Sequence, residues 1–299
     1  KVDYFENCNV YDIIDIINDY DAIFTNPNKS KVFLGEELLK LAKNLKVICT
    51  ASTGTNHIDV GFCKIKNISI LSLKEERHVI DKISSTAEHA MALTLASIRN
   101  IPNSYQSVLK GEWDYTKFIG RQINQLKVGV IGYGRLGKLY ANYCSSMGAE
   151  VFVFDPFIEI KNSKINKIND LTLMLPQIDI LSIHVHVNKD TINLIDESLL
   201  RLMKPDIVIV NTSRGEIINE VDLIKRLNSN PLMKVAVDVV SDEVRNKKNN
   251  LLLKFARESN QILITPHIGG MTKEAQEIAY NHSAKNLKIF FKKFNNKGG

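Results

Sequence analysis

The chain has 299 residues, which is enough for two domains that each bury a core. Its formal net charge is +6, but the lysines are scattered among Asn and Ile, which argues against a nucleic-acid surface. The sequence holds no apolar run of the ~18 residues that a membrane span needs, no signal segment, and no CxxC pair among its four cysteines. We therefore expect a cytoplasmic protein with no metal, no membrane and no nucleic acid among its partners.

Short apolar runs in the first third of the chain predict buried parallel strands at residues 22–25, 47–50 and 68–71. Helical patterns separate them at residues 11–20, 35–43 and 59–64. Residues 2–5 are a candidate for one more strand. Together these segments predict a first, small, doubly wound α/β unit.

A longer helix is predicted from about Ser84 to Arg99, because apolar residues recur along one stripe until the break at Pro102. Six further apolar runs predict the strands of a second unit, at residues 128–131, 151–154, 180–183, 207–210, 235–237 and 262–264. Residues 272–291 then predict a last helix. A single trailing helix cannot bury itself, so it should pack on one of the two units.

The six strands of the second unit all end on glycine or polar residues. In chain order the endings lead to the glycine loop 132–137, Asp155, His184, Arg214, Glu243 and His267. Ligands of open parallel α/β sheets bind beyond the carboxyl ends of the strands. We therefore expect the chemistry of this protein at that edge.

The loop Gly132-Tyr133-Gly134-Arg135-Leu136-Gly137 follows a β-branched strand and precedes a helix-forming stretch, and Asp155 closes the next strand. This context favours a dinucleotide-binding loop over an ordinary structural turn with an incidental acid. Gly132 permits the turn, Gly134 lets amides approach a pyrophosphate, and Gly137 allows close helix packing. Asp155 would bind the ribose hydroxyls and repel a 2′-phosphate, so the expected cofactor is NAD.

Four segments, residues 130–137, 211–215, 238–243 and 265–270, resemble in order and spacing the D-isomer-specific 2-hydroxyacid dehydrogenases, which include the D-3-phosphoglycerate dehydrogenases. Residues 52–59, 85–89 and 111–113 agree as well, so the resemblance spans nearly the whole chain. It implies two doubly wound parallel-sheet domains. A flavodoxin-like substrate domain, residues 1–99 and 269–299, would be split around an inserted Rossmann NAD-binding domain, residues 100–268.

The resemblance implies an NAD-dependent oxidoreductase that interconverts a D-2-hydroxy acid and its 2-oxo acid. Arg214 suits the substrate carboxylate, because its planar fork forms two hydrogen bonds to such a group. His267 suits the proton donor, and a neighbouring Glu243 would favour its protonated form. The amides of Ser52, Thr53 and Gly54 would complete the carboxylate cradle from the other domain, with the substrate between the two.

The cofactor-binding residues implied in this way are Gly132, Gly134, Arg135, Leu136, Gly137, Asp155, His184, Thr212, Asp238, Gly269 and Gly270. The expected small-molecule partner is a 2-oxo or 2-hydroxy acid. The predicted 84–99 helix and the segment after it resemble the region through which this family pairs its subunits. We therefore expect a homodimer.

Some features depart from the family pattern. A basic residue that helps to bind the substrate phosphate in D-3-phosphoglycerate dehydrogenases corresponds to Asn26, although Lys29 or Lys31 offers a substitute charge. Val240 and Val244 replace a phenylalanine and a proline near Glu243. Two other interpretations stay open: an NAD(H)-sensing corepressor or binding scaffold of the same fold, and a purely structural role for the charged cluster.

Overall fold

The computed structural model describes residues 2–6, 8–26, 32–244 and 247–296. The chain divides into two compact units. Unit 1 comprises residues 1–83 and 270–299, and unit 2 comprises residues 84–269. The chain returns to unit 1 between residues 269 and 270, one residue from the expected boundary at 268/269. It first crosses to unit 2 between residues 83 and 84, well before the expected boundary at 99/100.

The first boundary differs because helix α5 (Ser85–Ile98) packs entirely within unit 2. Its buried Ala87, Ala90 and Leu93 belong to the same apolar cluster as Tyr140 of helix α7 (Arg135–Ser146). Thr94 Oγ1 also lies 2.7 Å from the hydroxyl of Tyr140. The sequence pattern identifies an amphipathic helix but does not tell which of two sheets its apolar stripe covers.

Unit 2 is built on a seven-stranded parallel sheet in the order β10-β9-β8-β7-β4-β5-β6. Its strands are β4 (Lys127–Ile131), β5 (Glu150–Phe154), β6 (Ile165–Lys167), β7 (Ile180–Ile183), β8 (Val208–Asn211), β9 (Lys234–Val237) and β10 (Ile262–Ile264). The strand order reverses between β4 and β7, as in a Rossmann sheet. Six strands match the apolar runs of the sequence, whereas β6 was not predicted because Ile165 is its only buried residue.

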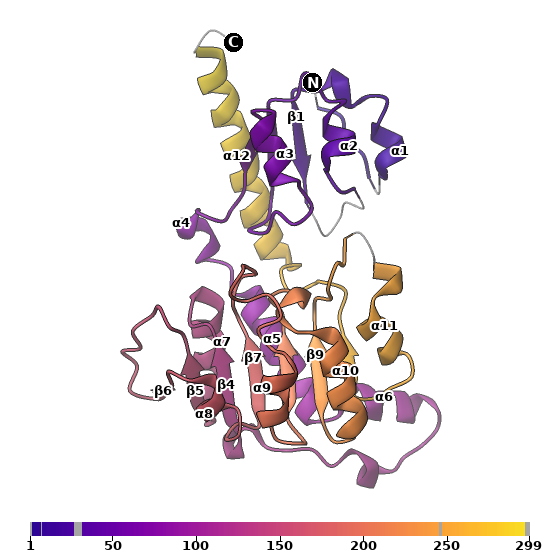
Figure 1. Ribbon diagram of the computed structural model, residues 1–299, viewed down its shortest axis with the longest axis vertical. Helices are drawn as coiled ribbons and strands as arrows, with labels where there is room; N and C mark the ends of the chain where they lie inside the picture. Colours follow the sequence, from indigo (N-terminus) through magenta and orange to yellow (C-terminus); the bar gives the residue numbers. More distant parts are fainter. Residues whose placement is uncertain (1, 7, 27–31, 245–246, 297–299) are drawn as a thin grey trace. The chain divides into compact units, whose positions relative to one another are not determined.

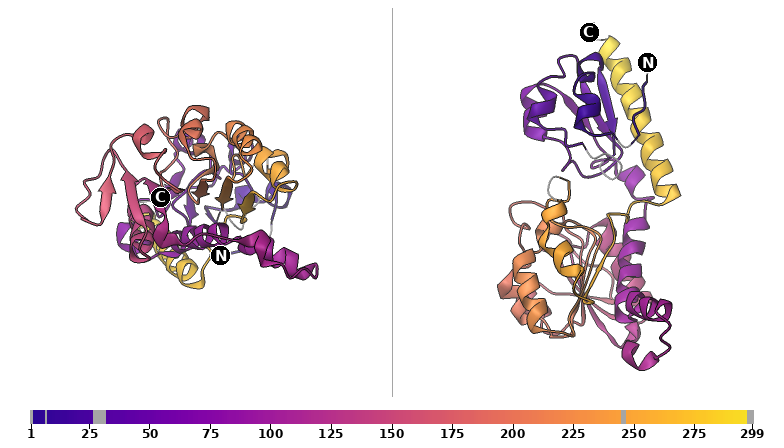
Figure 2. Two further views of the ribbon diagram at one scale, coloured as in Figure 1. Left: turned by 90° about the horizontal axis from the view of Figure 1, so that it is seen from below. Right: turned by 90° about the vertical axis from the view of Figure 1, so that its right-hand side faces the viewer.

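Helices cover both faces of this sheet (Figures 1 and 2). Helices α5 and α7 enclose one apolar cluster with the sheet. The other face is covered by α8 (Leu171–Met174), α9 (Glu197–Leu202), α10 (Glu220–Ser229) and α11 (Leu251–Ala256). Burial on both faces explains why β7 and β8 are buried at every position and appear as continuous apolar runs.

The predicted break at Pro102 is the start of another helix, α6 (Ile101–Leu109). Asn100 adopts a left-handed conformation with φ of 57°, which ends α5 and turns the chain. Pro102 lies in the first turn of α6, where the amide hydrogen that proline lacks has no helical partner. The short 3₁₀ helices of this unit are η2 (Tyr115–Phe118), η3 (Ile123–Gln125), η4 (Gly215–Ile217) and η5 (Lys247–Asn249).

Unit 1 contains a parallel sheet of β1 (Ala22–Thr25), β2 (Val47–Thr50) and β3 (Ser69–Leu71), which lie side by side in chain order. Its helices are α1 (Val10–Ile13), η1 (Ile17–Asp19), α2 (Glu36–Leu39), α3 (Val60–Ile65), α4 (Arg77–Ile80) and α12 (Lys273–Asn296). All three predicted strands are present. Among the described residues, no strand pairs with the outer edge of β1 in this sheet. The reversal of strand order that defines a doubly wound sheet is therefore seen in unit 2 alone.

Two local predictions for unit 1 are wrong. Residues 2–5 form no strand, and Val2 and Tyr4 are exposed rather than packed on the sheet. The helix predicted for residues 11–20 is two short pieces, α1 and η1, since this stretch is rich in Ile, Asp and Asn, which are weak helix formers.

The trailing helix α12 packs on the sheet of unit 1, as expected of a helix that cannot bury itself (Figures 1 and 2). Ala275 and Ala279 are buried, and the thiol of Cys49 in β2 contacts the carbonyl oxygen of Ser283 at 3.4 Å. Among the described helices, none has the length and apolarity that a membrane crossing requires.

Candidate active site

The glycine loop after β4 has the geometry of a nucleotide-binding loop. Gly132 has a φ of 90°, and a Cβ atom there would lie 2.6 Å from the carbonyl oxygen of His184. A Cβ on Gly137 would lie 1.9 Å from the Gly132 oxygen, so α7 can pack on the loop only through glycine. Gly134 caps α7 and has open space at its Cβ position. A helix N-terminus beside open space suits a phosphate.

Asp155, directly after β5, ties this loop to the end of the next strand. Its Oδ2 accepts from the amide of Tyr133 at 2.7 Å, and its Oδ1 accepts from the amides of Phe157 and Ile158 at 2.9 and 3.1 Å. An ionised carboxylate offers about four acceptor positions. Three are used, so the buried Asp155 retains one acceptor position, as its predicted bond to a ribose hydroxyl requires.

Two further expected cofactor residues carry buried polar atoms that have no hydrogen-bond partner among the described residues, Thr212 Oγ1 and His184 Nδ1. A buried polar atom left in this way costs free energy, so each marks a place where a bound molecule could supply the partner. His184 Nε2 lies 2.8 Å from Ser182 Oγ, and burial lowers the pKa of His184 to about 3. This ring is therefore neutral near pH 7 and is no general acid.

The loop after β8 presents Arg214. Asn211, the last residue of β8, donates from Nδ2 to the carbonyl oxygen of Arg214 at 2.8 Å and accepts from the amide of Ser213 at 2.9 Å. Ser213 donates to the carbonyl oxygen of Ile183 at 2.7 Å, which fixes the loop to β7. Arg214 itself donates to the Ser213 oxygen at 2.6 Å and is half-buried. Its guanidinium thus rests on a well-anchored loop.

The loop after β9, which carries Glu243, is held by the Arg214 loop. A Cβ on Gly215 would lie 2.1 Å from the carbonyl carbon of Val240, so the two loops are in direct contact. The carboxylates of Glu220 and Glu216 accept from the amides of Ser241 and Asp242 at 2.8 and 3.1 Å. Val240 and Val244, which differ from the family pattern, therefore leave the loop that carries Glu243 well anchored.

His267 Nδ1 lies 2.6 Å from Glu243 Oε1, and both side chains are largely buried, at 25% and 14% exposure. His267 has a φ of 56°, a conformation that costs free energy in any residue other than glycine and is frequent at functional sites. The expected pair is thus formed, although the two residues follow different strands. With Nδ1 bonded to the carboxylate, the ring is held in one orientation, which is consistent with the predicted role of His267 as the proton donor.

Asp238 holds the segment that contains His267. Its carboxylate accepts from Thr265 Oγ1 at 2.5 Å and from the amides of Ile268 and Gly269 at 2.8 and 2.7 Å, while His89 Nε2 lies 3.3 Å away. Burial alone would raise the pKa of Asp238, but the hydrogen bonds from His89, Thr265 and these amides keep it below its usual value. The structure supports a positioning role for Asp238, and its expected contact with the cofactor stays a prediction.

The sequence predicts no role for His89, yet this residue is part of the network around Asp238. Its Nε2 lies 2.8 Å from Thr265 Oγ1, so α5 helps to fix the strand end that leads to His267. The only signal in the sequence was the family-like segment 85–89, since His89 and Asp238 are far apart in the chain.

In unit 1, the expected substrate loop follows β2. Ser52 Oγ lies 2.9 Å from Thr50 Oγ1 and donates to the carbonyl oxygen of Gly54 at 2.7 Å, which holds the loop in a tight turn. Within the described residues, nothing accepts a hydrogen bond from the amides of Ser52, Thr53 or Gly54. Successive free amides of this kind form an anion-binding concavity.

The remaining predicted residues lie as follows. Arg135 and Leu136 begin α7, and Gly270 is exposed on the segment that leads into α12. Asn26, which follows β1, donates from Nδ2 to the hydroxyl of Tyr280 at 2.7 Å. Lys29 and Lys31, the substitute phosphate ligands, lie outside the described residues.

A family model described as "D-isomer specific 2-hydroxyacid dehydrogenase, NAD binding domain" matches residues 91–269, more than half of the chain. The chain belongs to this family. It is 31% identical over 280 residues to D-3-phosphoglycerate dehydrogenase from Synechocystis sp., with 92% of this chain and 48% of that protein covered. It is 32% identical over 267 residues to the enzyme of that name from Archaeoglobus fulgidus, with coverage of 89% and 48%. The chain thus spans about half the length of these relatives.

Solved structures of the family share the fold. The D-lactate dehydrogenase of Aquifex aeolicus, complexed with NAD and lactic acid, has a TM-score of 0.80 and 27% identity, with 95% of this chain and 87% of that chain covered. An NAD-dependent formate dehydrogenase from Staphylococcus aureus in complex with NAD has a TM-score of 0.81 and 26% identity, with coverage of 94% and 82%. These similarities confirm the parallel α/β class and the Rossmann NAD-binding domain.

Proposed function

We propose that this chain interconverts a D-2-hydroxy acid and the corresponding 2-oxo acid with NAD. In the reductive direction, 2-oxo acid, NADH and a proton give the 2-hydroxy acid and NAD⁺. The observation that carries this proposal is the 2.6 Å pair of His267 and Glu243 at the carboxyl edge of the unit 2 sheet. Arg214 stands at the same edge, at the end of β8.

The residues would divide the work as follows. NAD(H) supplies or accepts the hydride. His267, held through Nδ1 by Glu243, gives a proton from Nε2 to the carbonyl oxygen during reduction and takes it back during oxidation. Arg214 neutralises the carboxylate of the acid and polarises the adjacent carbonyl. In unit 1, the free amides of Ser52, Thr53 and Gly54 form an anion-binding concavity that suits a carboxylate.

The cofactor residues of unit 2 fit a dinucleotide. The open space at Gly134 favours Gly132, Gly134, Arg135, Leu136 and Gly137 as the phosphate loop. Thr212 Oγ1, which has no partner among the described residues, favours a further cofactor contact after β8. A second group comprises His184, Asp238 and Gly269, which follow other strands of unit 2, and Gly270, where the chain returns to unit 1.

Asp155 favours NAD over NADP, because its carboxylate would repel a 2′-phosphate. One solved structure of similar fold, an acyclic imino acid reductase at 25% identity, is complexed with NADPH, so the fold alone does not decide this choice. We expect kcat/KM to be at least tenfold higher with NADH, or about 1.4 kcal/mol. Asp155→Asn keeps the shape of the side chain but removes its charge, so it should lower the ratio of kcat/KM with NADH to kcat/KM with NADPH. Equal ratios in parent and variant would contradict the role of Asp155.

Oxidation of NADH with a panel of 2-oxo acids tests the proposed activity. The panel should include pyruvate, glyoxylate, hydroxypyruvate and 3-phosphohydroxypyruvate. Turnover with any of them, lowered about 100-fold or more in His267→Asn, supports the dehydrogenase. Tight NADH binding without oxidation would instead favour the NAD(H)-sensing corepressor or scaffold.

The same panel addresses the substrate. Asn26 is neutral and is bonded to Tyr280, so it supplies no charge for a phosphate. We therefore propose that this chain acts on a small unphosphorylated acid, in contrast to the named activity of its D-3-phosphoglycerate dehydrogenase relatives. A kcat/KM that is highest for 3-phosphohydroxypyruvate would contradict this and point to Lys29 or Lys31.

We also propose a homodimer. Apolar side chains on and after α6 are exposed: Ile101, Tyr105, Val108, Leu109, Trp113, Tyr115 and Ile119. We call this set the α6 patch. An exposed apolar patch of this kind marks an interaction surface, and a second copy of the chain is the partner that the resemblance predicts. All four cysteines are free, which supports a reducing, cytoplasmic location.

A further inference from the structure

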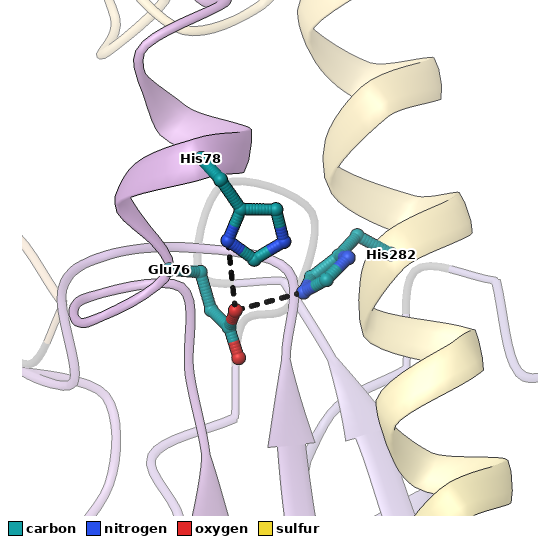
Figure 3. Close-up of side chains that lie close together, drawn as sticks. All are labelled: Glu76, His78 and His282. Carbon is teal, nitrogen blue, oxygen red and sulfur yellow. Dashed lines mark ion pairs between the residues drawn. The ribbon is translucent and has the colours of Figure 1, made fainter.

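Two histidines and a glutamate meet in unit 1, away from the strand ends of unit 2. Glu76 immediately precedes α4, His78 lies in α4, and His282 comes from α12. Figure 3 shows the two imidazole rings directed toward one carboxylate oxygen. Oε2 of Glu76 lies 3.1 Å from His282 Nε2 and 3.7 Å from His78 Nδ1, and all three atoms lie within 4.8 Å of one another.

These separations are close to those that a metal ion imposes. With nitrogen and oxygen ligands at 2.0–2.2 Å, a tetrahedral ion holds its ligand atoms roughly 3.3–3.5 Å apart. The two measured distances from Glu76 bracket this range. The separation of the two imidazole nitrogens is within 4.8 Å. His78 can rotate to adjust it, because 72% of its side chain is accessible to solvent.

A neighbouring amide already orients the carboxylate. Asn286, one turn beyond His282 on α12, donates from Nδ2 to Glu76 Oε1 at 3.0 Å. This bond directs the other oxygen, Oε2, toward the two imidazoles. Partners that fix a ligand from outside in this way typically accompany metal sites. The same Nδ2 lies 3.1 Å from His282 Nε2, and an ion would replace that contact.

We propose that Glu76, His78 and His282 form a binding site for a divalent transition-metal ion of the zinc class. Two imidazole nitrogens and one carboxylate suit Zn²⁺, Co²⁺ or Ni²⁺ better than Mg²⁺ or Ca²⁺, which prefer all-oxygen ligand sets. The exposed side of the site leaves the remaining coordination position to water. The sequence indicated no metal, because its ligands come from opposite ends of the chain and share no recognisable spacing.

The ion would link two elements of unit 1 that adjoin the crossings to unit 2. Helix α4 ends shortly before residue 83, where the chain leaves unit 1, and α12 begins shortly after residue 270, where it returns. A bound ion would cross-link α4 to α12. We therefore expect Zn²⁺ to raise the midpoint of thermal unfolding of the full chain.

Titration of the chelator-treated full chain with Co²⁺, followed by the visible absorption of the bound ion, tests this site. We expect one equivalent to bind, and each of His78→Asn, His282→Asn and Glu76→Gln to weaken binding by about tenfold or more, since even an outer partner of a metal ligand contributes that much. His186→Asn, at an exposed histidine of unit 2, and Glu243→Gln are the controls and should bind as the parent does. NADH binding should be unchanged in the three ligand variants, and a metal-free midpoint of thermal unfolding equal to the parent's shows that unit 1 still folds in them.

Three results would overturn the site. The first is the absence of Co²⁺ binding by the parent at micromolar concentration. The second is binding that His78→Asn or His282→Asn leaves at the parental affinity. The third is binding that Glu243→Gln abolishes, because the ion would then lie at the His267 pair.

Discussion

His267 owes its orientation to one side chain and its backbone conformation to another. Glu243 accepts from the ring at Nδ1, while Asp238 holds the amides of Ile268 and Gly269 that follow it. The ring can therefore present Nε2 in one direction without rearrangement. Preorganisation of this kind lowers the barrier to proton transfer, because no reorientation is needed during the reaction.

Replacing either member of the pair should reduce turnover by different routes. His267→Asn removes the proton donor and should lower kcat about 10²–10⁴-fold. Glu243→Gln leaves the ring but allows the wrong tautomer, so kcat should fall by about 10²-fold or more. Steady-state reduction of the best 2-oxo acid measures both. NADH affinity should stay at the parental value, and Glu258→Gln, at an exposed carboxylate on unit 2, should retain parental kcat. Near-parental kcat in His267→Asn would show that the proton comes from another group.

His184 should make the stability of the chain sensitive to acid. Its pKa is about 3 in the folded protein, well below the ~6.5 of an unfolded histidine. The unfolded state therefore takes up a proton first, so the stabilisation is complete above about pH 6.5 and is lost as the pH falls toward 3. Between pH 7.5 and pH 5 this contributes a loss of about 2 kcal/mol.

The free energy of unfolding in urea at these two pH values tests the effect. His184→Gln should reduce the loss on acidification by about 2 kcal/mol, as the glutamine does not titrate. His186→Gln, at an exposed position, should behave as the parent does. An unchanged pH dependence in His184→Gln would mean that His184 is protonated in the folded state.

Two glycines of the loop before α7 should affect different properties of the chain, Gly137 its stability and Gly134 its affinity for NADH. Gly137 contacts the backbone of Gly132, whereas Gly134 faces open space. Gly137→Ala should destabilise the chain by about 1–3 kcal/mol, as expected of overpacking. Gly134→Ala should leave stability within about 0.5 kcal/mol and weaken NADH binding about tenfold or more, because its methyl group would occupy the place of the pyrophosphate. Thermal unfolding and NADH fluorescence titration measure the two effects. Parental NADH affinity in Gly134→Ala would exclude this loop as the phosphate site.

The elements that the sequence predicted well are those whose signal is local. Buried parallel strands appear as apolar runs, and the polar residues that follow them, among them Asp155, Arg214 and His267, lie after the strand ends as expected. Their roles in binding and catalysis stay predictions. Strand β6 carries one buried residue and escaped notice. The bond between His89 and Thr265, and the meeting of Glu76 with His282, join residues far apart in the chain. No periodicity along the sequence encodes such contacts.

At the scale of the whole molecule, we expect the exposed α6 patch to be the interface of a homodimer. Trp113 is 89% exposed and Leu109 63% exposed, and both are apolar enough to favour burial against a second copy. Light scattering at micromolar concentration should return about twice the 33.8 kDa of one chain. Leu109→Glu combined with Trp113→Glu should return the monomer mass, because charges do not tolerate burial in an apolar interface. Leu232→Glu is the matched control, since Leu232 is 70% exposed outside this patch, and it should leave the mass unchanged. A parent protein with the mass of one chain would contradict the dimer. A dimer that persists in the double variant would show that the interface lies outside the α6 patch.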